Sequence, residues 1–102
     1  MLYAIIAPMI KGFADAQSEG LFRGQRPMRL PNQIHRAALR KLLVLDAAES
    51  LQDLRLAPGN RLEKLKGRRM GQYSIRINDQ WRICFGWHDG DAYSVEIADY
   101  HS

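Results

Sequence analysis

The chain has 102 residues, 46% of them hydrophobic, and a formal net charge of +4. A chain of this length can bury one core but not two, so we expect a single domain over residues 1–102. A single cysteine, Cys84, excludes an intrachain disulfide and has no metal-binding residues near it in the sequence, which predicts a reducing compartment, the cytoplasm, and no metal site.

Basic residues are segregated from acidic ones. No acid occurs between Gly20 and Leu45, whereas that segment carries six basic side chains. Segregation of this kind is typical of nucleic-acid-binding proteins, because it produces a positive face toward phosphates. A second basic run follows, and we expect it to contact an RNA backbone through Arg61, Lys64, Arg68, Arg69 and Arg76.

The N-terminal part is predicted to be one short strand and one short helix. Residues 1–8 are apolar but too short for a signal peptide or a membrane span, so we interpret them as an extension and Met9 as the better chain start. The alternation in 10–13 indicates an edge strand against the C-terminal sheet. Asp15 is expected to cap a helix that ends by Gly24.

The middle of the chain is predicted to be helical. Pro31 and Asn32 mark a helix start, with Asn32 as its cap, and an apolar stripe follows at Ile34, Ala38, Leu42 and Leu45. A short helical turn is expected near 50–54, and Pro58-Gly59-Asn60 indicates a turn. Residues 61–65 alternate as a strand would, and a basic, glycine-bounded loop covers 66–71.

The C-terminal third has the period of three antiparallel strands. Alternation places Tyr73, Ile75 and Ile77 on the core face, and the next two strands follow the same pattern. Three-residue loops at 78–80 and 88–90 would put Arg76 opposite Arg82. Two like charges directly across a strand pair suggest an anion between them.

The same register would put Glu96 opposite Arg82 and Tyr93 on the core face. Arg82 and Glu96 could then form an ordinary cross-strand ion pair, which leaves two readings of this arginine open. The element order, one short strand, two to three helices and then four strands, predicts an α+β fold with the helices on one face of a curved, mainly antiparallel sheet.

The residues available support metal-free cleavage of RNA. Phosphate loops, nucleophile elbows and metal-ligand spacings are absent from the sequence. In such cleavage the ribose 2′-OH attacks its own phosphate, so the protein must move protons and stabilise charge, and no cofactor is expected. The candidate phosphate ligands are Lys66, Arg76 and Arg82, and the candidate proton carriers are Glu63, Asp99, Tyr100 and His101.

Three segments resemble the HigB group of the RelE toxin superfamily: RLEKLKG at 61–67, GQYSIRINDQWRICF at 71–85 and DAYSVEIADYH at 91–101. The resemblance implies a toxin that cleaves mRNA on the 70S ribosome. It also implies a HigA-like helix-turn-helix antitoxin as partner, with operator DNA bound only through that antitoxin, and no membrane.

Carried over to this chain, the resemblance implies that Lys66 and Arg82 are phosphate ligands and that 99–101 form a catalytic cluster. Many family members have a histidine where this chain has Glu63, which still can accept a proton but needs a raised pKa to donate one. The general base could be Asp99 or His101. Two other readings remain: a non-catalytic RNA-binding or antitoxin-binding module, and an inert partner of a DNA-binding repressor.

Overall fold

The computed structural model describes residues 9–100, and these form a two-layer α+β fold. Three helices precede the sheet: α1 (Ala16–Phe22), α2 (Asn32–Ala47) and α3 (Leu51–Leu56). Four strands then follow in spatial order β1-β2-β3-β4: β1 (Glu63–Lys64), β2 (Gln72–Arg76), β3 (Trp81–His88) and β4 (Asp91–Asp99). All neighbouring strands are antiparallel, so the predicted fold class is confirmed.

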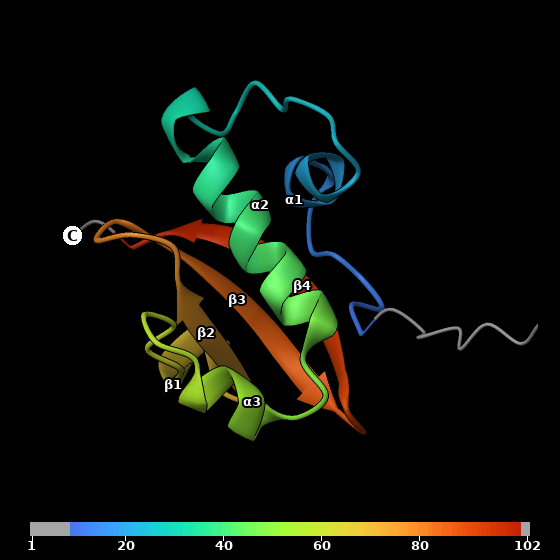
Figure 1. The fold of residues 1–102 in the computed structure, drawn as a ribbon, viewed down its shortest axis with the longest axis vertical. Coiled ribbons are helices and arrows are strands. Elements are labelled where there is room, and N and C mark those ends of the chain that lie inside the picture. The colour runs from blue at the N-terminus through green and yellow to red at the C-terminus, as the bar shows by residue number, and fades with distance from the viewer. Residues whose placement is uncertain (1–8, 101–102) are drawn as a thin grey trace, which may run out of the picture.

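The helices cover one face of the sheet. In Figure 1, α2 runs across the strands, with α1 beside its first half and α3 toward β1 and β2. The predicted edge strand at 10–13 is present as two parallel bridges to β4, Ile10 to Ala92 and Phe13 to Val95. The N-terminal segment therefore borders the last strand of the chain.

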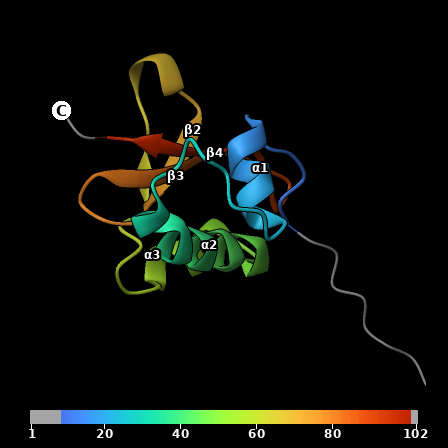
Figure 2. The same ribbon diagram turned by 90° about the horizontal axis from the view of Figure 1, so that it is seen from above.

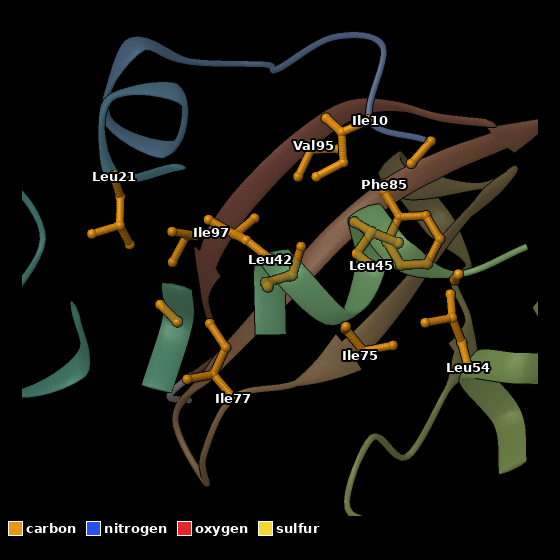
Figure 3. Packing of buried hydrophobic residues seen from close by; sticks show 14 of the residues in the cluster. Ile10, Leu21, Leu42, Leu45, Leu54, Ile75, Ile77, Phe85, Val95 and Ile97 are labelled. Carbon is orange, nitrogen blue, oxygen red and sulfur yellow. The ribbon is translucent and has the colours of Figure 1, made fainter. Parts of the chain in front are cut away.

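The buried stripe of α2 forms the centre of the core, as its periodicity predicts. Ile34, Ala38, Leu42 and Leu45 are all buried. Figure 3 shows Leu42 and Leu45 among the side chains that the sheet directs toward the helix, which include Ile75, Phe85 and Val95.

The helix boundaries follow local capping chemistry. The Asp15 carboxylate accepts a hydrogen bond from the Ser18 N–H at 2.7 Å, so the predicted cap of α1 is confirmed. In α2 the prediction was wrong: Asn32 is the first helical residue, and Pro31 occupies the cap position without a side-chain hydrogen bond. The fixed φ of proline favours that start even without a polar cap.

The predicted strand over 61–65 shortens to Glu63–Lys64. Arg61 has a φ of 45°, in the left-handed region, so the chain cannot be extended there. Beyond β1, the chain forms a short 3₁₀ turn, η1 (Gly67–Arg69), before it enters β2.

The pairing of β2 with β3 has the predicted register, with Ile75 opposite Ile83 and Arg76 opposite Arg82. Ile77 lies just beyond β2, and its N–H donates to the Trp81 carbonyl. The first hairpin of the sheet was therefore predicted correctly from its alternation.

The pairing of β3 with β4 differs from the prediction. The loop has two residues, Asp89 and Gly90, both with positive φ, and His88 pairs with Asp91. A bulge then places an extra residue of β4 between the pairs Cys84–Glu96 and Gly86–Tyr93. Ser94 lies in this bulge and has a φ of 51°.

The predicted position of Glu96 opposite Arg82 is therefore wrong, because the two-residue loop and the bulge each shift the register by one residue and together bring Ala98 there. The predicted core position of Tyr93 is also wrong, since this residue is 39% exposed. Beyond the bulge, alternation returns to the core face, so Val95 and Ile97 are buried as predicted.

Candidate active site

The site lies on the face of the sheet away from α2, called here the outer face. One cross-strand row defines it, because Glu63 pairs with Ser74, Ser74 with Cys84, and Cys84 with Glu96. Arg82 lies two residues before Cys84 on β3 and so belongs to the same face. Each of the four strands thus contributes a side chain to this surface.

Arg82 is a charged residue that is nearly buried in the outer face, with 9% of its surface exposed. Its Nε donates to Ser74 Oγ at 2.7 Å, and its Nη2 donates to the carbonyl of Arg61 and, at 3.4 Å, to that of Ser74. The guanidinium is planar, so fixing two of its nitrogens also fixes the direction of the third, Nη1.

Nη1 is the nitrogen of Arg82 that faces Glu63. It lies 4.0 Å from the Glu63 carboxylate, whose side chain is 59% exposed. Contact at this distance is loose, and Glu63 is open to solvent, so the carboxylate does not hold Nη1 firmly. The alternative ion pair between Arg82 and Glu96 does not form: within residues 9–100, Glu96 pairs with Arg69, and Glu63 is the carboxylate that pairs with Arg82.

Tyr100 is held next to this cluster by two contacts. Its N–H donates to the Gln80 carbonyl at 2.6 Å, and its hydroxyl forms a 3.5 Å hydrogen bond with Cys84 Sγ. Burial, and then the contact with Cys84, raise the pKa of Tyr100 to about 12, although Arg69 and Arg82 act in the opposite sense. The phenol is therefore protonated at neutral pH and can donate a hydrogen bond.

Cys84 is completely buried beneath Tyr100, and burial raises the pKa of its thiol. A buried neutral thiol is a poor nucleophile, in agreement with its predicted role as a small filler. Neither Ser74 nor Cys84 was predicted to support the site. Ser74 could have been suspected from its outer-face position two residues before Arg76, since a small hydroxyl leaves room for a neighbouring arginine.

Arg69 and Arg76, both predicted to bind RNA, are engaged in ion pairs. Arg69 Nη1 donates to Glu96 at 3.0 Å and to Gln72 at 3.2 Å. Arg76 pairs with Asp79 in the following loop. The opposed Arg76 and Arg82 are thus each compensated by protein groups, so their pairing requires no bound anion.

The other predicted phosphate ligands are exposed and have no side-chain partner within residues 9–100. Lys66 precedes η1, and Lys64 pairs with Tyr73 and so points to the other face at the β1 edge. The remaining two are Arg61, which precedes β1, and Arg68, which lies within η1.

Asp99 is not brought to Arg82. It pairs with Trp81 and shares the face of Ile97, opposite to that of Tyr100. Gln80 Nε2 donates to its carboxylate at 3.1 Å. His101, the third member of the predicted cluster, lies outside the described residues.

Residues 9–100 contain no group of three or more histidine, cysteine or acidic side chains that could hold a metal ion. Within the same residues, no helix combines the length and the apolar character needed to cross a membrane.

A pocket of about 290 Å³ lies between α1 and α2, in the helical layer and not on the outer face. Its walls combine apolar and basic side chains, among them Leu21, Leu39, Arg26 and Arg36. It is thus separate from the cluster around Arg82.

Known proteins similar to this chain share its size and fold. The chain is 46% identical over 86 residues to Toxin HigB-1 of Vibrio cholerae, covering 83% of this chain and 90% of the relative. It is 33% identical over 93 residues to Endoribonuclease HigB of Proteus vulgaris, covering 91% and 100%. A solved structure, the YoeB-YefM complex from Staphylococcus aureus, matches with a TM-score of 0.57 at 20% identity, covering 91% of this chain and 98% of that one, and so shares the fold.

The family description that matches the sequence spans nearly all of the described chain. Residues 11–101 match the family described as RelE-like toxin of type II toxin-antitoxin system HigB. Because that match covers most of the chain, and two relatives exceed 30% identity over more than two thirds of it, the protein belongs to the HigB-like toxins of type II toxin–antitoxin systems.

Proposed function

We propose that this toxin is a ribosome-dependent endoribonuclease that cleaves mRNA by attack of a ribose 2′-OH on the adjacent phosphate, without a metal ion. A family relative at 33% identity carries the name Endoribonuclease HigB, which supports RNA as the substrate. The reaction class suits the outer face, because the substrate supplies its own nucleophile and the protein has only to move protons and stabilise charge.

The observation that carries the proposal is the immobilised guanidinium of Arg82. Two of its nitrogens are held by Ser74 and the Arg61 carbonyl, and the third is directed to the more open side of the site. A donor fixed before substrate binds needs no reorganisation as negative charge develops on a pentacoordinate phosphorus, and such preorganised groups contribute strongly to catalysis.

Groups beside Arg82 would transfer the protons. Glu63, at 4.0 Å from Nη1, can accept the 2′-OH proton, and Tyr100 can donate from its protonated phenol to a phosphate or leaving oxygen. His101 remains a candidate from the sequence for the same chemistry. Asp99 faces the other side of the sheet, so we assign it to holding the loop at Gln80 and not to the base.

Exposed basic side chains would hold the RNA backbone. Lys66 at the start of η1 is the candidate second phosphate ligand, and the exposed residues that flank it provide further positive charge. We propose that the cell restrains this activity through an HigA-like helix-turn-helix antitoxin, and that operator DNA is bound only through that partner. The site of action would be the cytoplasm, where ribosomes translate mRNA.

The test is cleavage of an mRNA with and without 70S ribosomes, mapped by primer extension. Wild-type protein is expected to produce new 5′ ends only with ribosomes. Arg82→Ala should lower the cleavage rate by about 10² to 10³-fold, the usual effect of removing one transition-state donor. Arg40→Ala, on the exposed side of α2, is the matched control and should cleave at the wild-type rate.

Because Arg82 is buried, its replacement could also disturb the fold. Circular dichroism and thermal unfolding of Arg82→Ala and Arg82→Lys separate the two effects, since a folded but slow variant isolates catalysis. If folded Arg82→Ala retains most of its cleavage, the role of Arg82 is wrong. If wild-type protein slows translation but leaves no new 5′ ends, the protein is a binding module and not a nuclease.

A further inference from the structure

The turn that follows β1 folds over the outer face. We call residues 66–71 the basic turn, because it carries Lys66, Arg68 and Arg69. In Figure 2 it rises from the sheet on the side away from α2 and α3. Leu65, immediately before it, is buried in a small cluster with Cys84 of β3 and Ala98 of β4.

Beyond Leu65, one side chain ties the basic turn to the far side of the sheet. Arg69 Nη1 contacts Glu96 of β4 at 3.0 Å, a residue 27 positions later in the chain, and also Gln72 Oε1 at 3.2 Å. The other hydrogen bonds of the turn are local, such as Met70 N–H to the Gly67 carbonyl. Local bonds fix the shape of the turn but not its orientation over β3 and β4.

The orientation of the turn matters because of Lys66. Lys66 is the residue directly before η1, and its side chain is exposed and has no partner within residues 9–100. The lysine side chain thus makes no contact that fixes its own position, so its distance from Arg82 and Tyr100 depends on the turn. A contact that holds the turn also holds Lys66.

We propose that Arg69 and Glu96 form a positioning pair that holds the basic turn, and with it Lys66, over the Arg82 cluster. This inference rests on the proposed nuclease function and assigns Arg69 a role other than the RNA contact expected from the sequence. The guanidinium of Arg69 is committed to a carboxylate and an amide of the protein, and its side chain is only 31% exposed. An RNA phosphate would have to displace Glu96 to reach it.

Charge reversal distinguishes a positioning pair from an RNA ligand. Arg69→Glu and Glu96→Arg each place two like charges at 3.0 Å, so each should lower the cleavage rate on ribosomes by roughly 10 to 100-fold, as small misplacements of catalytic groups do. The loss should appear mainly in kcat, because the proposal places Lys66 at the reacting phosphate beside Arg82, where charge builds up in the transition state. The double variant Arg69→Glu/Glu96→Arg restores opposite charges and should recover most of the rate.

An RNA ligand predicts a different pattern. If Arg69 contacts phosphate, Arg69→Glu should raise KM, the double variant should remain defective, and Glu96→Arg alone should not impair cleavage. That result would overturn the inference while leaving the nuclease function standing.

Cys84 offers a second measurement that needs no activity. It is the single cysteine of the chain, is fully buried, and packs with Leu65 beneath the basic turn. If the pair holds the turn down, the rate of maleimide labelling at Cys84 should rise at least about tenfold in each single charge-reversal variant and return toward the wild-type rate in the double variant.

Arg68→Glu is the matched control for labelling. It makes the same charge change in the same turn, but Arg68 has no side-chain partner within residues 9–100 that the change would disrupt. Its Cys84 should stay protected. Unchanged labelling in Arg69→Glu would overturn the inference even if the wild-type protein proved not to cleave RNA. Absence of wild-type cleavage alone would instead overturn the proposed function.

Discussion

At the scale of single residues, the outer face depends on small side chains that make room for larger ones. Ser74 accepts a hydrogen bond from Arg82, and Cys84 contacts the phenol of Tyr100. Replacing either by a larger side chain would displace the functional group above it. The chemistry of the site is thus set by its neighbours in the sheet as much as by the residues that would touch RNA.

The Tyr100 phenol predicts how the stability of the protein depends on pH. Its pKa is raised from an ordinary value of 10.0 to about 12, so the folded protein favours the neutral phenol. The stability that Tyr100 contributes is complete below pH 10, where both states hold the proton. It is lost as pH rises through the window from 10 to about 12, because the unfolded chain ionises first.

The measurement is the tyrosinate absorbance of wild-type protein minus that of Tyr100→Phe. The difference curve should have its midpoint near 12, because Tyr100 is the only tyrosine that the two proteins do not share. A midpoint near 10 would show that neither burial nor Cys84 perturbs this phenol.

At the scale of elements, the hairpin of β3 and β4 decides which residue faces Arg82. Asp89-Gly90 forms a two-residue turn whose positive φ values suit the twist of a hairpin, and the bulge at Ser94 shifts the register by one residue. The small side chain of Ala98 then lies opposite Arg82, and Glu96 is free to reach Arg69.

The left-handed backbone of Ser94 in the bulge predicts how substitutions there change stability. Its φ of 51° costs an L-residue about 1–2 kcal/mol, most for a β-branched side chain. Serine already carries much of this cost, so Ser94→Val should lower the free energy of unfolding by the additional strain of a β-branched side chain, roughly 1 kcal/mol, whereas Ser94→Gly should leave it unchanged or raise it slightly.

Urea denaturation, analysed with the same m-value for both variants, measures their free energies of unfolding. Ser94 is exposed, so lost burial does not contribute to the comparison. Equal stability of the valine and glycine variants would mean that the left-handed backbone at this position is not strained.

The registers of the two hairpins differ in how far they could be predicted from the sequence. Alternation alone placed Ile75 opposite Ile83 and Arg76 opposite Arg82, because the first hairpin contains no irregularity within its paired residues. In the second hairpin, Asp89-Gly90 is itself a signal for a two-residue turn, and that signal was available. The bulge was not, because nothing in the side chain of serine demands a positive φ.

The candidate site was predictable to the same extent. The period of β3 identified Arg82 as an outer-face residue, and the correctly predicted pairing with β2 placed Ser74 near it. Its contact with the Arg61 carbonyl could not be predicted, because it depends on the left-handed backbone of Arg61. Likewise, the proximity of residues 99 and 100 in sequence suggested one cluster, although a strand directs consecutive side chains to opposite faces.

At the scale of the whole molecule, stability depends on α2 packed against the sheet. Leu42 is fully buried at the centre of that contact, whereas the next residue, Leu43, is 53% exposed. Leu42→Ala should lower the free energy of unfolding by about 2–5 kcal/mol, as truncation of a core leucine does. Leu43→Ala should change it by about 0.5 kcal/mol or less.

Thermal and urea unfolding followed by circular dichroism compare the two neighbouring variants directly. Similar losses of stability would mean that α2 is not anchored through the face that carries Leu42. Cleavage by Leu43→Ala should match the wild type, because the outer face lies on the other side of the sheet.

The border between the N-terminal segment and β4 has a consequence for synthesis of the protein. Ile10 and Phe13 bridge to Ala92 and Val95, and the buried Ser18 hydroxyl accepts the Ile97 N–H from 79 residues further along. Ile97 is synthesised 79 residues after Ser18, so in a nascent chain α1 and the segment before it lack these partners until β4 has emerged from the ribosome. The toxin therefore completes its fold only after β4 has been synthesised.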